Sequence, residues 1–388
     1  MTRKVVIVGA GVVGAACAFH ATAAGMDVTV IDRGPVGAGT TSRGEGNILV
    51  SDKEPGPELS LARLSRTLWE EAAQEVGPET IELEPKGGLV VASTGESLRS
   101  LNAFAARQAA CGVRVEPVEH VRDLEPHLAA GLPGGVHYPQ DAQVQPVLAA
   151  AALLDAAVAR GARLLTGEVT AAAADRGGRV TGVLTASGDV LQADAVINAA
   201  GTWGGEVGRR LGAPIEVLPR RGFVLVTEPL PPMVHHKVYS ADYVANVASS
   251  DEGLETSCVV EGTRGGTILI GASRERVGFD MTPNPAVLTT LAAQACRLFP
   301  SLKKVHLIRA YRGFRPYCPD HLPVIGPDPR LPQVVHACGH EGAGIGLAPA
   351  TGALVTAHLL GHPWHGADPA AYTGLLPDRF FTQGGASK

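Results

Sequence analysis

The stretch that decides the fold is Val5-Val6-Ile7-Val8-Gly9-Ala10-Gly11-Val12-Val13-Gly14, followed eighteen residues later by Asp32. The short apolar run at 4–8 predicts a strand buried on both faces. The alanine-rich run at 12–24 predicts a helix that ends at Gly25, a residue typical of helix C-termini. Residues 27–31 predict a second strand. This order and these lengths predict a βαβ unit and therefore a parallel sheet.

Each glycine of this stretch has its own expected role. Gly9 lets the chain turn from strand to helix, Gly11 lets the backbone approach a pyrophosphate, and Gly14 lets helix and strand pack closely. The helix N-terminus offers N–H donors and the positive end of its dipole to the same anion. Asp32 stands at the tip of the second strand, where it can accept hydrogen bonds from ribose hydroxyls. The sequence therefore predicts a dinucleotide site.

Two later segments favour FAD over a nicotinamide dinucleotide. The expected strand at 193–199 runs into the small-residue turn Ala200-Gly201-Thr202-Trp203-Gly204. The loop 339–347 is rich in glycine and opens an expected helix at 348–360. The N-terminus of this second helix would give N–H donors to the electron-rich edge of a reduced flavin. A nicotinamide enzyme has no need of such a second cradle.

Size and composition exclude several other classes. The chain has 388 residues, which is enough for two cores. A net charge of -5 gives no reason to expect nucleic acid. None of the six cysteines is three residues from another, so no metal centre or redox dithiol is expected. Scattered thiols fit a reducing compartment.

The N-terminus imitates a signal peptide, because Arg3-Lys4 precedes an apolar run. That run contains Gly9, Gly11 and Gly14 and lacks a cleavage site in the usual place. No stretch reaches the roughly 20 apolar residues of a membrane span. We expect a cytoplasmic protein with no membrane span.

The middle of the chain is expected to be rich in strands. Strands are expected at 87–92, 163–165, 180–185, 195–199, 221–227, 258–261 and 267–270, and helices at 145–160 and 285–298. We predict an α/β FAD-binding Rossmann-type domain with a parallel sheet, assembled from residues 1–50, 140–215 and 315–388. An inserted α+β, mostly antiparallel substrate-binding domain would comprise 51–139 and 216–314.

The motifs taken together resemble a known family. They are the N-terminal fingerprint, Thr41-Ser42-Arg43-Gly44-Glu45-Gly46-Asn47, the turn at 198–204, Gly313-Phe314-Arg315-Pro316, and the loop at 339–352. Over the whole chain they resemble the D-amino-acid oxidase superfamily. Within it, the chain is most similar to the branch of glycine oxidase, sarcosine oxidase, cyanide-forming glycine dehydrogenase and the hydroxyproline or opine dehydrogenase subunits.

The resemblance implies an FAD-dependent enzyme that oxidises an amino or imino acid, a primary or secondary amine. A hydride passes from the carbon next to nitrogen to flavin N5 and leaves an imine. The implied partners are this small-molecule substrate and either O2 or an electron-acceptor partner. The oligomeric state stays open.

The resemblance also implies a set of cofactor contacts. These are Gly9, Gly11, Val13, Gly14, Asp32, Arg33, Thr41, Ser42, Gly46, Asn47, Val169, Gly201, Trp203, Gly339, Gly342, Gly344 and Ile345.

Three residues are implied at the substrate. Arg315 matches the position that clamps the substrate carboxylate, a task suited to the planar fork of arginine. The alternative is a structural arginine paired with an acid such as Asp320. Tyr243 is a candidate for the other side of the carboxylate, with Tyr239 nearby. His340 is a candidate for contact with the flavin edge, or it packs within its loop.

The sequence departs from the family pattern in several places. Gly342 stands where glycine oxidases carry an arginine, which puts oxidation of plain glycine in doubt. Glu341 is either a contact for an amine or an exposed loop acid. Arg43 and Glu45 are unusual charges near the expected flavin, and Arg43 is a candidate for a second substrate carboxylate. Cys318 does not match the position of covalent flavin attachment and is expected to be a packed thiol.

Two rival functions remain. One is a non-catalytic or electron-relay FAD subunit of a larger dehydrogenase complex. The other is a flavin hydroxylase, which shares the N-terminal fingerprint. The chain lacks the late Gly-Asp-Ala-Ala motif of the hydroxylases, which argues against that class.

Overall fold

The N-terminal segment folds as the sequence predicts. A computed structural model describes residues 2–241, 253–363 and 372–381. Strand β1 (Lys4–Val8) leads into helix α1 (Val12–Ala23) and strand β2 (Asp27–Asp32). β1 and β2 are parallel, with Val5 beside Val28. The predicted βαβ unit is confirmed.

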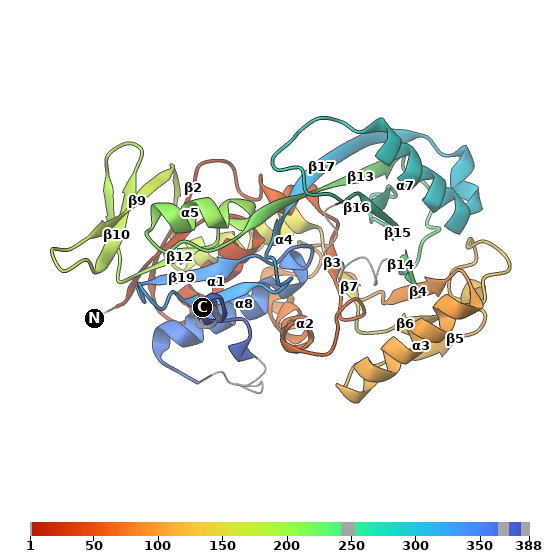
Figure 1. Ribbon diagram of the computed structural model, residues 1–388, viewed down its shortest axis with the longest axis horizontal. Helices are drawn as coiled ribbons and strands as arrows, with labels where there is room; N and C mark the ends of the chain where they lie inside the picture. Colours follow the sequence, from red (N-terminus) through yellow and green to blue (C-terminus); the bar gives the residue numbers. More distant parts are fainter. Residues whose placement is uncertain (1, 242–252, 364–371, 382–388) are drawn as a thin grey trace, which may run out of the picture.

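A largely parallel sheet forms around this unit. Within the described ranges it has the strand order β18 (Val324–Pro327), β19 (Val334–Cys338), β12 (Ala195–Asn198), β1, β2, β8 (Arg163–Thr166). Only the edge strand β18 is antiparallel to its neighbour. The strands come from stretches that are far apart in sequence and lie together in one lobe (Figure 1).

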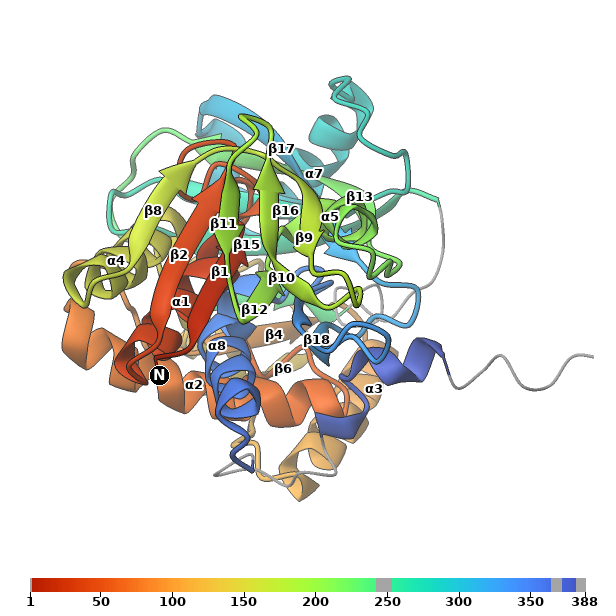
Figure 2. The ribbon, with the colours of Figure 1, turned by 90° about the vertical axis from the view of Figure 1, so that its left-hand side faces the viewer.

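Alternate side chains of β1 serve two different cores. Val5 and Ile7 belong to a core that includes residues of helices, whereas Val6 and Val8 belong to a second core. The helices on the first side are α1, α2 (Pro57–Val76), α4 (Pro146–Ala159) and α8 (Gly344–Leu360). The second side is covered by α5 (Gly204–Arg210) and by the meander β9 (Val169–Ala174), β10 (Val180–Thr185) and β11 (Val190–Gln192), which Figure 2 shows in front of the sheet. Burial on both faces explains why β1 is apolar throughout its length after Lys4.

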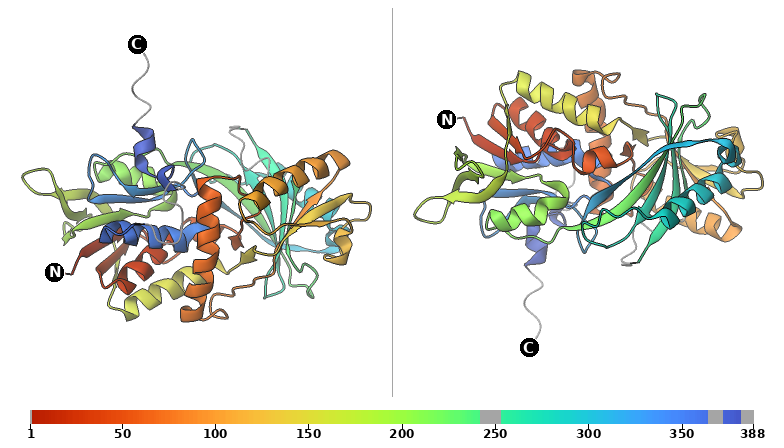
Figure 3. Two further views of the ribbon diagram at one scale, coloured as in Figure 1. Left: turned by 90° about the horizontal axis from the view of Figure 1, so that it is seen from below. Right: turned by 90° about the horizontal axis from the view of Figure 1, so that it is seen from above.

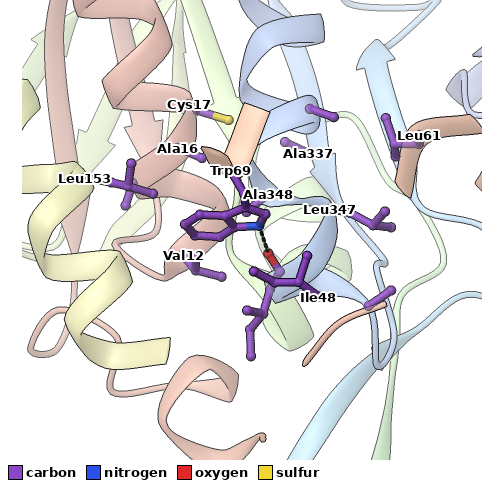
Figure 4. Packing of buried hydrophobic residues seen from close by; sticks show 14 of the residues in the cluster. Val12, Ala16, Cys17, Ile48, Leu61, Trp69, Leu153, Ala337, Leu347 and Ala348 are labelled. Carbon is purple, nitrogen blue, oxygen red and sulfur yellow. Dashed lines mark hydrogen bonds between the residues drawn. The ribbon is translucent and has the colours of Figure 1, made fainter. Parts of the chain in front are cut away.

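Trp69 of α2 ties this core to the beginning of α8. Its side chain is fully buried, and its indole N–H donates to the Ile345 carbonyl at 3.1 Å. Figure 4 shows Trp69 packed among Val12, Ala348 and other apolar side chains of the cluster. The long helix α2 therefore supports the glycine-rich loop that opens α8.

The second lobe is a mostly antiparallel sheet. Its order within the described residues is β17 (Leu307–Tyr317), β13 (Leu218–Thr227), β16 (Ile268–Arg274), β15 (Glu255–Gly262), β14 (Lys237–Ser240), β4 (Gly88–Ala92), β6 (Gly134–Tyr138), β5 (Glu116–Val118). Only the β14–β4 pair is parallel. Helix α7 (Pro285–Leu298) packs on one face, and α3 (Gly95–Ala110) lies against β4 and β6 (Figure 3). The expected fold class, an α/β cofactor domain with an α+β substrate domain, is confirmed.

The remaining elements are short. They are β3 (Asn47–Ile48), which pairs with β7 (Ala142–Gln143), and the 3-10 turns η1 (Thr40–Arg43), η2 (Val121–Asp123), η3 (Gly201–Trp203), η4 (Pro300–Lys304) and η5 (Pro377–Phe380). No helix among the described residues combines the length and the apolar character needed to cross a bilayer.

Strand β17 was not predicted. It is eleven residues long and pairs with β13 along most of its length, from Leu218 beside Tyr317 to Thr227 beside Leu307. Its sequence carries arginines at 309, 312 and 315 and shows no clear apolar alternation, so its strand character depends on pairing with β13.

The domain boundaries stay a prediction, and two features of the structure bear on them. Helix α2, which falls in the segment 51–139, packs on α8 of the first lobe. The boundary between 314 and 315 lies inside β17, which runs from one lobe into the other (Figure 1).

Candidate active site

The turn between β1 and α1 depends on glycine for steric reasons. Gly9 has φ of 117°, and a Cβ there would lie 2.4 Å from the Ala199 carbonyl oxygen. A Cβ at Gly14 would lie 1.9 Å from the Gly9 carbonyl oxygen. In contrast, a Cβ at Gly11 would meet only the Thr41 hydroxyl, at 3.2 Å. Gly9 and Gly14 therefore permit the fold itself, whereas Gly11 leaves open space in front of the helix.

A large cavity begins at this helix N-terminus. Gly11 is the N-cap residue of α1, and the Val12 N–H donates to the Thr41 hydroxyl at 3.1 Å. Gly11, Val12 and Val13 line the cavity. Asp32 lies beside them and is oriented by two backbone amides, Ala10 N at 2.7 Å and Gly34 N at 2.9 Å. Each carboxylate oxygen can accept more than one hydrogen bond, so these contacts leave capacity for ribose hydroxyls.

The cavity reaches from the βαβ unit to the second sheet. Arg33 and Trp203 line it together, and the Arg33 guanidinium lies over the Trp203 ring, 4.6 Å from the ring centroid. Beyond them the lining includes Asn47 and the loop that opens α8. Ala343 is the N-cap of α8, and Gly342, Gly344 and Ile345 line the cavity, so a second helix N-terminus lies beside it.

Most predicted cofactor contacts line this cavity. They are Gly9, Gly11, Val13, Asp32, Arg33, Thr41, Asn47, Val169, Gly201, Trp203, Gly342, Gly344 and Ile345. The substrate candidates Arg315 and His340 line it as well. Tyr243 lies outside the described residues.

Four predicted contacts, Gly14, Ser42, Gly46 and Gly339, lie behind the lining. Gly14 packs on Gly9 as described above. The Ser42 hydroxyl donates to Ala38 O at 3.2 Å. A Cβ at Gly46 would lie 1.9 Å from Val144 O, and one at Gly339 would lie 2.3 Å from Cys318 Sγ. The structure gives each of these residues a local role in shaping the loops that form the site.

The side of the cavity formed by the second sheet contains two glycines that were not among the predicted cofactor contacts. Gly222 of β13 and Gly313 of β17 are directly paired and both line the cavity. A Cβ at Gly222 would lie 2.2 Å from Arg315 Nη1, and one at Gly313 would lie 2.3 Å from Arg43 Cβ. Glycine within a strand often marks the close approach of another group, and this was the available signal.

A backbone carbonyl of the second sheet holds the Arg315 side chain on this side of the cavity. Its Nη1 donates to Ser273 O at 2.8 Å, and its Nε would lie 3.6 Å from a Cβ at Gly342. Asp320, the acid named as an alternative partner for Arg315, contacts Arg379 at 2.6 Å. Arg315 therefore lines the cavity beside Gly342.

Glu341 is not an exposed loop acid. Its side chain is 10% exposed and contacts Arg220 at 2.5 Å and His321 at 3.0 Å. Burial by itself raises the pKa of Glu341, but the hydrogen bond from His321 and the charges of Arg220 and Arg274 outweigh it and lower that pKa to about 2. Glu341 is therefore a carboxylate engaged by cations of the protein.

His340 and Tyr239 both pack inside the protein. Burial lowers the pKa of His340 to about 3, so its imidazole is neutral near pH 7. The Thr351 hydroxyl donates to Leu347 O, so His340 Nε2 donates to Thr351 Oγ1 at 2.9 Å. Tyr239 is fully buried and its hydroxyl bonds to Ser51, away from the cavity lining.

The ion pairs of Glu341 predict acid sensitivity of the fold. The folded-state pKa of about 2 is below the ordinary 4.5, so Glu341 contributes stability above about pH 4.5 that is lost as the pH falls to about 2. The full contribution is on the order of 3 kcal/mol. Glu341→Gln should flatten the pH dependence of the unfolding free energy in this window, measured by urea denaturation.

Glu70→Gln is the matched control for this experiment. The Glu70 side chain is 58% exposed and pairs with Arg66 on the surface of α2, where a salt bridge contributes little. Its pH profile should match that of the wild type. An unchanged acid slope in Glu341→Gln would contradict the electrostatic role given to Glu341.

The site as a whole fits FAD. Two helix N-termini lie at one cavity, and Gly11 leaves space in front of the first of them for a pyrophosphate. Asn47 Oδ1 is a buried acceptor with no hydrogen-bond partner among the described residues, and Asn47 lines the same cavity. Cys318 lies behind Gly339, buried and apart from the lining, as expected of a packed thiol. Fold and site together define a flavin-dependent oxidoreductase.

Comparison with known proteins gives the family. Residues 4–358 match the model of the DAO family, described as FAD-dependent oxidoreductases, and the chain belongs to that family. It is 30% identical over 369 residues to glycine oxidase of Geobacillus kaustophilus, covering 92% of this chain and 93% of that protein. It is 31% identical over 382 residues to glycine oxidase of Pseudomonas aeruginosa, covering 96% and 98%.

Solved structures agree with this assignment. The crystal structure of glycine oxidase from G. kaustophilus superposes with a TM-score of 0.84 at 28% identity, covering 97% of this chain and 98% of that one. L-proline dehydrogenase from P. horikoshii gives a TM-score of 0.86 at 23% identity, with 98% of both chains covered, and shows likeness of fold. The suspected family and the FAD cofactor are confirmed.

Proposed function

We propose that this chain is an FAD-dependent oxidoreductase that oxidises an amino or imino acid at the carbon next to nitrogen and gives an imine. Membership of the FAD-dependent family and the similarity to two glycine oxidases support this reaction class. FAD, when bound, supplies the acceptor for the hydride that leaves the substrate. The protein's own contribution is to hold the substrate in a productive position.

The observation that carries the proposal is the position of Arg315. Its guanidinium lies where the cavity meets the second sheet, in space left open by Gly222, and Ser273 O fixes its orientation. A guanidinium binds a carboxylate through two parallel, charge-assisted hydrogen bonds. We assign to Arg315 the carboxylate of the substrate, and Tyr243 stays a candidate for its other side.

The lining residues divide between cofactor and substrate in this proposal. Those of the βαβ unit, η1, the turn at η3 and the α8 loop would hold FAD. Gly14, Ser42, Gly46 and Gly339 would support these loops. His340, neutral and bonded to Thr351, would fix the conformation of the α8 loop and would exchange no proton near pH 7.

The electron acceptor and the location of the protein are further parts of the proposal. Reoxidation would use O2 or an electron-acceptor partner. All six cysteines are free in the structure, which supports a reducing compartment, and we infer a cytoplasmic enzyme.

An anaerobic test separates the possible outcomes. Holoprotein is mixed with D-amino acids, N-methylglycine, both hydroxyproline isomers and an opine, and the absorbance of oxidised flavin is followed. We expect one class of compound to bleach the flavin, and admission of air then distinguishes an oxidase from a dehydrogenase. Failure of every compound, in a sample that dithionite does bleach, would contradict the proposal and favour an electron-relay subunit.

A further inference from the structure

Another charged residue of the cavity lining is Glu45, which lies between η1 and β3. The residue is 7% exposed and lines the cavity together with Arg315. Its Oε1 is buried and has no hydrogen-bond partner among the described residues. The other oxygen receives only a long contact from Asn47 Nδ2, at 3.5 Å. Burying a carboxyl group without a hydrogen-bond partner costs free energy unless another group binds it.

The second sheet makes room for Glu45 in the same way as it does for Arg315. A Cβ at Gly271 of β16 would lie 2.5 Å from Glu45 Oε1 and 3.0 Å from its Cδ. The strand beside β16 is β13, where Gly222 leaves space for the Arg315 guanidinium. On the neighbouring strands β16 and β13, a glycine therefore leaves room for a charged group of the cavity. The group is the acidic Glu45 at β16 and the basic Arg315 at β13.

Lys237, a cation near Glu45, already has another acidic partner. Lys237 is fully buried and forms an ion pair with Glu261. Burial raises the pKa of Glu45, and the Glu261 charge raises it further, whereas Lys237 and Arg315 lower it. A cationic or N–H-bearing ligand in the cavity beside Glu45 would supply a partner for its carboxyl group.

We propose that Glu45 receives the nitrogen of the substrate while Arg315 holds its carboxylate. This deepens the proposed function and rests on it. The substrate class is then an amino or imino acid that carries at least one N–H when it binds, and tertiary amines are disfavoured. Glu341, the acid that the sequence offered for this task, is already bound to Arg220 and His321. Glu45 would be a binding and positioning residue, with no proton transfer required of it.

Two ligands of nearly equal shape test the proposal without turnover. 2-Aminoisobutyrate carries an amine and a carboxylate but no hydrogen on its α-carbon, so it cannot be oxidised there. In 2,2-dimethylpropanoate a methyl group replaces the amine. Each ligand is titrated into FAD-loaded protein, and the Kd is read from the perturbation of the oxidised-flavin spectrum.

We expect Glu45→Gln to weaken binding of 2-aminoisobutyrate about 10- to 100-fold, which is the size of a lost hydrogen bond to a charged group. Binding of 2,2-dimethylpropanoate should not weaken by more than about twofold, because Arg315 is untouched and the removed carboxylate would only repel this anion. Glu341→Gln is the matched control and should preserve the preference for the amine. Glu45→Asp keeps the charge and should retain part of that preference, which gives a second variant if the glutamine protein is poorly folded.

The outcomes distinguish this inference from the proposed function. Equal weakening of both ligands would mean that Glu45 supports the cofactor or the clamp, and would overturn the inference alone. An unchanged preference for the amine in Glu45→Gln, or its loss in Glu341→Gln, would also overturn it. Failure of the wild-type protein to bind either ligand would contradict the role of Arg315 in binding the carboxylate. Both the proposed function and the inference about Glu45 would then lose their basis.

Discussion

Arg315→Ala is expected to abolish most substrate-dependent bleaching of the flavin while FAD stays bound. The variant loses two charge-assisted hydrogen bonds to the substrate carboxylate, each contributing about 1.5–3 kcal/mol. Together these correspond to a decrease in kcat/KM on the order of 10²- to 10⁴-fold. The measurement is the rate of anaerobic flavin reduction against substrate concentration, with bound FAD quantified in the same sample.

Arg309→Ala is the control for loss of an arginine from the same strand. Arg309 is exposed, lies outside the cavity lining and rests on the Tyr311 ring, 5.6 Å from its centroid. Its kinetics should match the wild type. If Arg315→Ala reduced its flavin as fast as wild type, the carboxylate clamp would be wrong, and a subunit that only relays electrons would become the better account.

The second large effect is expected for Gly11→Val, which should fold but bind FAD weakly. The nearest atom to a Cβ at this position is the Thr41 hydroxyl at 3.2 Å, so the new Cβ itself meets no backbone group. The valine would instead occupy the space through which the backbone approaches the pyrophosphate. Overpacking of this kind costs about 1–3 kcal/mol, so we expect FAD affinity to fall about 10- to 100-fold. The measurement is quenching of FAD fluorescence as apoprotein is added.

Gly95→Ala is the corresponding control. Gly95 begins α3 on the surface, and the nearest atom to a Cβ there is Arg99 Nη1 at 3.8 Å. Circular dichroism should show that both variants keep the native secondary structure. Wild-type FAD affinity in Gly11→Val would contradict the position given to the pyrophosphate.

The parts of the fold that could be predicted are those encoded locally. The βαβ unit follows from an apolar run, a glycine turn and an alanine-rich helix that are adjacent in sequence. Helix α7 was predicted with the bounds that the structure shows, and the structure adds that the Asn284 side chain caps it and Pro285 begins it. Strand β17 was missed because its arginine-rich sequence becomes a strand only through its long pairing with β13.

The site shows the same division between local and distant information. Gly9, Gly11 and Asp32 could be assigned because one motif holds them in a fixed arrangement. The role of Glu341 could not be assigned from the sequence, because its partner Arg220 comes from strand β13, which is far away in the chain. Glu45 and Gly271 are 226 positions apart in the chain, and only the folded structure shows that the glycine leaves room for the carboxyl.

The central claim is that the enzyme removes hydrogen from the carbon beside the amine nitrogen. The direct measurement is the anaerobic rate of flavin bleaching at saturating substrate, for an active amino acid and for the same compound with deuterium on that carbon. We predict that the deuterated compound bleaches the flavin several-fold more slowly and to the same final extent. Equal rates in the bleaching step, or no bleaching by either compound, would contradict the account.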